Sequence, residues 1–76
     1  MANTISKYFK RELKTYKIFV QVNPDNFTGI ELIQHPDGKI EKTELEFDAE
    51  IFEDLEEDSF KSCSALEFQL LLSRVK

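Results

Sequence analysis

The stretch Lys17-Ile18-Phe19-Val20-Gln21-Val22 decides the fold of this chain, because it is dense in β-branched and aromatic residues. Such side chains suit the pleated surface of a sheet and lose rotamer freedom in a helix. We therefore predict a strand over residues 16–22. Phe19 and Val20 also fit a helical stripe that begins upstream, so the start of the strand stays open by several residues.

The segment before that strand carries apolar residues at helical spacing. Five of them fall within roughly 140° of one another on a helical wheel: Ile5, Tyr8, Phe9, Leu13 and Tyr16. The opposite side of the wheel is basic and holds Lys7, Lys10, Arg11, Lys14 and Lys17. We predict an amphipathic N-terminal helix that starts near Asn3 or Thr4, whose side chains can accept from the first free amides.

Turn residues divide the middle of the chain into two further strands. Asn23-Pro24-Asp25-Asn26 and Pro36-Asp37-Gly38 have turn chemistry, and they flank the segments 27–34 and 39–47. These two segments are predicted to form an antiparallel hairpin, in which Gly29 marks a bulge or a close backbone approach. The charges of segment 39–47 suit a sheet edge.

The C-terminal third is predicted to be mostly helical. Asp48 is a suitable N-cap for a short acidic helix over residues 49–58, in which Ile51, Phe52 and Leu55 follow helical spacing. Residues 60–64 are predicted to form a loop or an irregular turn.

Residues 65–75 are ambiguous between helix and strand. Alternation favours a strand and is carried by Leu66, Phe68, Leu70 and Leu72. Ser64 and Glu67 form a capping-box pattern, and the segment is rich in strong helix formers, which favours a helix. We predict a helix that is buried over much of its circumference.

These elements define an α+β fold. We predict one domain over residues 1–76, because 76 residues suffice for a single hydrophobic core. Its elements are the N-terminal amphipathic helix, a three-stranded antiparallel meander, and one or two C-terminal helices packed on one sheet face.

Residues that could carry chemistry are few. His35 and Cys63 are the only histidine and cysteine, and we interpret them as a solvated turn residue and a small half-buried residue. The acidic segment lacks the glycine that a calcium loop requires. Gly29 and Gly38 lie in unrelated contexts, which argues against a phosphate-binding loop. We therefore expect no catalytic residues, no cofactor and no metal site.

The expected location is the cytoplasm. The chain has no apolar run near the ~18 residues of a membrane span, and its N-terminus does not resemble a secretory signal. A lone free thiol fits a reducing compartment.

Charge is strongly segregated along the chain. Residues 1–20 carry five basic groups against one acid, whereas residues 41–58 carry ten acids against one lysine. We predict a non-catalytic protein-interaction module that contacts a basic partner, or a second copy of itself, through an acidic surface. The predicted contact residues are Glu44, Glu46, Glu50, Glu53, Asp54 and Glu57. The alternative is nucleic-acid or anionic-membrane binding through the basic side of the N-terminal helix.

Overall fold

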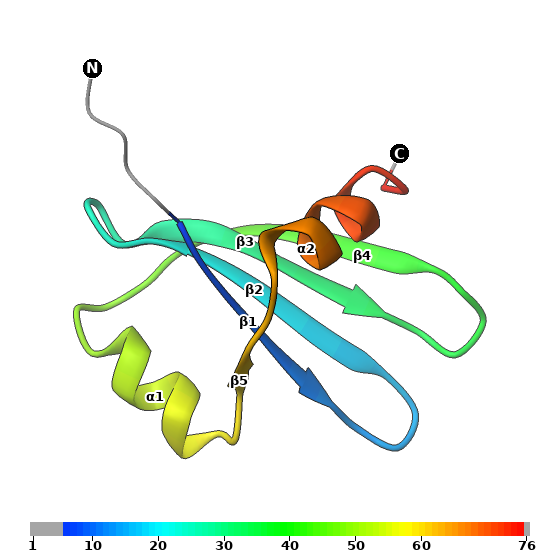
Figure 1. The fold of residues 1–76 in the computed structure, drawn as a ribbon, viewed down its shortest axis with the longest axis horizontal. Coiled ribbons are helices and arrows are strands. Elements are labelled where there is room, and N and C mark those ends of the chain that lie inside the picture. Colours follow the sequence, from blue (N-terminus) through cyan, green and yellow to red (C-terminus); the bar gives the residue numbers. More distant parts are fainter. Residues whose placement is uncertain (1–5, 76) are drawn as a thin grey trace.

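A five-stranded antiparallel sheet forms the centre of the molecule in the computed structural model, which describes residues 6–75 (Figure 1). The strands are β1 (Lys7–Glu12), β2 (Lys17–Asn23), β3 (Thr28–Gln34), β4 (Ile40–Glu46) and β5 (Lys61–Ser62). They lie in the order β4-β3-β2-β1-β5. Two short helices complete the fold, α1 (Ile51–Glu57) and α2 (Ala65–Leu72).

The predicted N-terminal helix is wrong, because residues 7–12 form strand β1. Tyr8 and Phe9 project to opposite faces of the sheet, since successive strand residues alternate. The Tyr8 ring lies 5.3 Å from the ring of Phe68 in α2, and the Phe9 ring lies 6.0 Å from that of Phe52 in α1. A strand that is covered on both faces needs apolar residues at adjacent positions. The adjacent pair Tyr8-Phe9 meets this need, and the same pair also fits the apolar side of a helical wheel. The predicted start at Asn3 or Thr4 lies outside the described residues.

The predicted three-stranded meander is also wrong in its extent. Strands β1 to β4 form a four-stranded meander, in which β1 pairs with β2, β2 with β3, and β3 with β4. Strand β5 then joins the outer side of β1, where Lys10 is opposite Lys61. The loop predicted for residues 60–64 is thus wrong at residues 61–62, which form a strand of two residues.

The two helices pack on opposite faces of the sheet, not on one face as predicted (Figure 1). Helix α2 buries Phe68 and Leu71 against Phe19 and Leu32, and we call this side the α2 face. Helix α1 buries Leu55 against Val20 and Val22 on the other side, the α1 face. The central strand β2 thus supplies core residues to both faces from neighbouring positions, Phe19 to the α2 face and Val20 to the α1 face. The sheet therefore has one helix packed on each of its two faces.

Gly29 marks a close backbone approach, which is one of the two alternatives that the sequence left open for it. A Cβ at this position would overlap the backbone oxygen of Gln21 on the neighbouring strand. The ring of Phe47 would also lie only 2.8 Å from that Cβ. Packing therefore requires glycine at this position. The predicted antiparallel hairpin, which consists of β3 and β4 and contains Gly29, is confirmed.

Helix α1 begins and ends differently from the prediction. Its N-cap is Glu50 rather than Asp48, and no side chain caps it. At the other end Ser59 adopts a left-handed φ of 65°, and the Phe60 amide donates to the Leu55 carbonyl at 2.9 Å. The Ser59 amide donates to the Glu56 carbonyl, so the helix ends in a Schellman motif.

Helix α2 confirms the helical alternative for residues 65–72. The Ser64 hydroxyl accepts a hydrogen bond from the Glu67 amide at 3.1 Å, as the capping pattern indicates. The Glu67 carboxylate, however, binds Lys10 of β1 instead of returning to Ser64. The predicted extent of burial is wrong, because Leu66 and Leu70 are 69% and 58% exposed.

Candidate functional site

His35 and Cys63 lie too far apart to act together. The Cys63 amide donates a hydrogen bond to the Tyr8 carbonyl. Tyr8 of β1 is opposite Gln21 of β2, which in turn is opposite Ile30 of β3. His35 lies five residues beyond Ile30, which is roughly 17 Å along the strand. A nucleophile and a base must be within hydrogen-bond reach, so these two residues do not form a catalytic pair.

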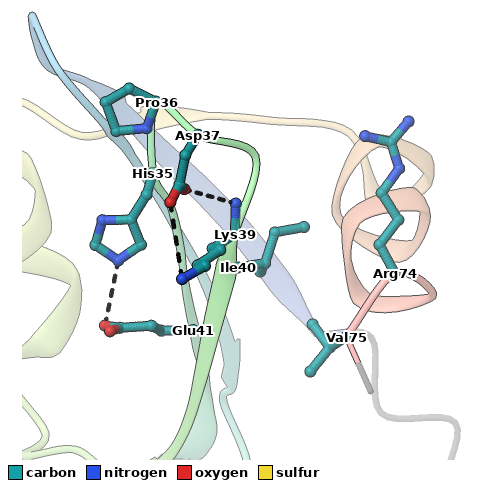
Figure 2. A pocket seen from close by; sticks show the side chains of 8 residues that line it. All are labelled: His35, Pro36, Asp37, Lys39, Ile40, Glu41, Arg74 and Val75. Carbon is teal, nitrogen blue, oxygen red and sulfur yellow. Dashed lines mark hydrogen bonds and ion pairs between the residues drawn. The ribbon is translucent and has the colours of Figure 1, made fainter.

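An open groove of about 740 Å³ lies between the β3–β4 turn and the end of α2 (Figure 2). Its lining consists of His35, Pro36, Asp37, Lys39, Ile40, Glu41, Arg74 and Val75. Ile40 and Val75 both pack against the α2-face core. The groove is therefore a shallow depression with an apolar side and a charged rim.

The charged groups of this groove are largely paired with one another (Figure 2). Asp37 accepts a hydrogen bond from the Lys39 amide at 3.0 Å, which closes the turn. His35 Nε2 approaches Glu41 Oε2 at 3.4 Å without meeting hydrogen-bond geometry. Arg74 extends away from these residues. The described charged groups of the groove therefore do not converge on one point.

Cys63 lies beside the ion pair of β1 and α2. Lys10 Nζ is 3.0 Å from Glu67 Oε1, and this hydrogen bond raises the pKa of Lys10. Burial raises the pKa of the Cys63 thiol, the Glu67 carboxylate raises it further, and Lys10 opposes them. A raised pKa keeps the thiol protonated near neutral pH, which makes it a poor nucleophile.

The reactivity of Cys63 tests this electrostatic balance. We expect Glu67→Gln to lower the thiol pKa and accelerate alkylation by iodoacetamide at pH 8, because the thiolate fraction rises as the pKa falls. Lys10→Met should slow the reaction, since it removes the group that lowers the pKa. Rate–pH profiles give the measurement, and equal rates in both variants would contradict it.

The predicted basic face does not exist as one surface. Lys7 and Arg11 share the α1 face of the sheet with Phe9, whereas Lys10 projects to the α2 face. Lys17 lies opposite Glu12, also on the α2 face, and Lys14 lies in the turn between β1 and β2. A strand alternates its side chains every residue, so the five charges that share one side of a helical wheel are divided.

The six predicted acidic contact residues are also divided. Glu44 is aligned with Ile30 and Glu46 with Thr28, so both project to the α2 face of β4. The other four, Glu50, Glu53, Asp54 and Glu57, lie on or beside α1 on the opposite face. The structure therefore does not bring the six together.

Helix α1 and the residues at its two ends instead carry a dense group of exposed acidic side chains. We call it the α1 acidic surface, and it consists of Asp48, Glu50, Glu53, Asp54, Glu56, Glu57 and Asp58. All seven side chains belong to exposed residues, and within residues 6–75 none of them forms an ion pair. The contact residues predicted from the sequence omitted Asp48, Glu56 and Asp58, although the dense run of acids between residues 48 and 58 was a visible signal.

The part of the chain that the structure describes contains neither a cluster of candidate metal ligands nor a helix that could span a bilayer. No group of three or more histidine, cysteine or acidic side chains there could hold a metal ion. None of the helices within residues 6–75 is both long and apolar enough to cross a bilayer.

Comparison with known proteins found no matching family model, no similar curated protein and no similar solved structure.

Proposed function

We propose that this protein is a non-catalytic interaction module that binds a basic protein partner through the α1 acidic surface. The proposal is carried by the placement of Glu56, Glu57 and Asp58, which form no ion pair within residues 6–75, at the C-terminal end of α1, where negative charge weakens the helix. Such a placement is explained if the charge serves a contact outside the chain.

The C-terminal turn of α1 shows this conflict most clearly. The free carbonyl groups at the end of a helix carry about half a negative charge, which basic residues stabilise. Here the last turn has no basic residue, and it carries Glu56 and Glu57 followed by the C-cap Asp58. Glu53 and Glu57 are also four residues apart, a spacing at which like charges repel. Stability alone favours a different sequence.

The unpaired charge is well suited to a partner that approaches from solution. Seven carboxylates on one short segment create a negative potential that accelerates association with a basic surface. Because the residues are exposed, this attraction is screened by salt over about 8 to 10 Å. The proposed contact is therefore salt-sensitive. The lone thiol supports the cytoplasm as its proposed location.

Glu57→Lys separates the stability of α1 from its proposed role. The substitution places a favourable charge at the helix end and gives Glu53 a partner of opposite charge one turn away, so we expect unfolding to require about 0.5 to 1 kcal/mol more free energy. The same variant should lose most of the capture of a basic protein from source-cell lysate at low salt. Urea denaturation and pull-down with quantitative mass spectrometry measure the two effects.

Glu12→Lys provides the matched control, because it makes the same change in net charge on the exposed end of β1. This control should retain capture. If Glu57→Lys and Glu12→Lys reduce capture equally, only net charge matters and the proposed surface is wrong. A wild-type protein that captures no salt-eluted partner would also contradict the proposal.

A further inference from the structure

Strand β4 is the long free edge of the sheet. It occupies one end of the strand order (Figure 1), and within residues 6–75 it pairs only with β3, along all seven of its residues. At the opposite end of the sheet lies the two-residue strand β5, which pairs only with Phe9 and Lys10 of β1 within residues 6–75. An edge of this length exposes a row of backbone donors and acceptors that another strand can pair with.

The hydrogen bonds at both ends of the hairpin show which backbone groups of β4 point outward. The His35 amide donates to the Lys39 carbonyl at 2.8 Å, and the Phe47 amide donates to the Phe27 carbonyl at 2.7 Å. Hydrogen-bonded pairs alternate along an antiparallel ladder, so the odd-numbered residues of β4 bond to β3. The outward amides and carbonyls therefore belong to Ile40, Lys42, Glu44 and Glu46.

Lys42 and Glu44 on this edge have no partner of opposite charge within the described chain. Lys42 is aligned with Leu32 on β3, and Glu44 is aligned with Ile30. Neither forms an ion pair within residues 6–75. Both project to the α2 face, one residue either side of Thr43.

We propose that a second copy of this chain pairs with β4, antiparallel and in register about a twofold axis at Thr43. Lys42 of each copy is then directly opposite Glu44 of the other, and Ile40 is opposite Glu46. These are the residues whose backbone groups point outward, so all four positions enter hydrogen-bonded pairs. The two sheets become one continuous ten-stranded sheet. The proposal concerns the β4 edge and does not rest on the α1 acidic surface.

Charge selects this register over its neighbours. In this twofold pairing the two copies present the same face of the sheet on the same side. The alternative registers that keep this arrangement differ from one another by a shift of the twofold axis by one whole residue along β4. An axis at Lys42 places the two lysines opposite each other, and an axis at Glu44 does the same with two glutamates. Like charges directly opposite destabilise a ladder, whereas opposite charges and paired threonines stabilise it. The axis at Thr43 brings together two Lys–Glu pairs and a Thr–Thr pair.

Charges on an edge often serve to prevent pairing with other molecules. Here their order is self-complementary, so they block misaligned pairing while permitting the twofold one. A seam of seven residues is smaller than a standard stable interface. The dimer is therefore expected to form reversibly and to depend on protein concentration.

Light scattering after size exclusion, with protein loaded from about 1 µM to about 1 mM, tests the dimer. The wild type should rise from 8.9 kDa toward twice that mass. Lys42→Glu and Glu44→Lys should each weaken association by about 10- to 100-fold, because each turns two attractive pairs into repulsive ones. The double variant Lys42→Glu/Glu44→Lys restores opposite charges and should dimerise like the wild type.

Mixing the two single variants gives a sharper result. In that heterodimer both glutamates of one chain are opposite both lysines of the other, so two monomeric proteins should form a dimer on mixing. Lys14→Glu and Glu12→Lys make the same net-charge changes away from β4 and should leave dimerisation unchanged. Circular dichroism shows that each variant is folded.

Cross-linking tests the position of the axis. In a Cys63→Ser background, Thr43→Cys should form an intermolecular disulfide, because the two Cα atoms in a non-hydrogen-bonded pair lie about 4.5 Å apart. Glu41→Cys, on the same face of β4, should not, since its counterpart is offset by roughly 13 Å along the strand.

Three results would overturn the proposal. The first is a wild type that stays at 8.9 kDa at every concentration. The second is a dimer that survives Lys42→Glu, and the third is a disulfide that forms in the Glu41→Cys variant instead of the Thr43→Cys variant. A failure of these tests leaves the Glu57→Lys capture experiment unaffected, because that variant lies on α1.

Discussion

Phe68→Ala is expected to lower the free energy of unfolding by about 3 to 5 kcal/mol. The Phe68 side chain is fully buried, contacts the Tyr8 ring at 5.3 Å, and joins α2 to the core residues Phe19 and Leu32. A single-core domain of this size is typically stable by only about 3 to 5 kcal/mol. The variant should therefore be largely unfolded at 25 °C, as measured by urea denaturation with circular dichroism.

The matched control is Leu66→Ala, two residues away on the same helix. Leu66 is 69% exposed, so its truncation should change stability by no more than about 0.5 kcal/mol. The contrast distinguishes packing from helix propensity, because alanine favours a helix in both variants. Equal losses in the two variants would mean that α2 does not pack through the face that carries Phe68.

Gly29→Ala is the second substitution with a large expected effect. The added methyl group would overlap the backbone oxygen of Gln21, which cannot move without disturbing the ladder between β2 and β3. We expect a loss of about 3 kcal/mol or more, at the upper end for an overpacked site. Thermal and urea unfolding measure the loss.

Gly38→Ala separates crowding from backbone conformation. Gly38 has a φ of 91°, but a Cβ there meets nothing within 4 Å. The cost should be that of a strained turn residue, about 1 to 3 kcal/mol, and below that of Gly29→Ala. A Gly29→Ala protein as stable as the wild type would show that β2 and β3 do not approach as closely as described.

The acidic residues of the candidate surface could be predicted from the sequence, but their arrangement on the folded molecule could not. The run of acids from residue 48 to residue 58 is visible in the sequence, and short-range rules place it on a helix. Which acids share a surface depends on the faces of the sheet. Glu44 and Glu46 project to the α2 face, whereas α1 packs on the other side, so neighbours in sequence are separated in space.

The sequence alone determined the elements whose signals are local. The β-branched run of β2, the turns on either side of β3 and the Ser64 cap of α2 all act within a few residues, and each is found in the structure. Only the tertiary structure decided that residues 7–12 form a strand and not a helix. Their aromatic pair Tyr8-Phe9 fits a helix when considered alone, and becomes a strand because helices formed more than 40 residues later cover both faces of the sheet. The burial of those two rings depends on partners distant in sequence, which outweigh local periodicity.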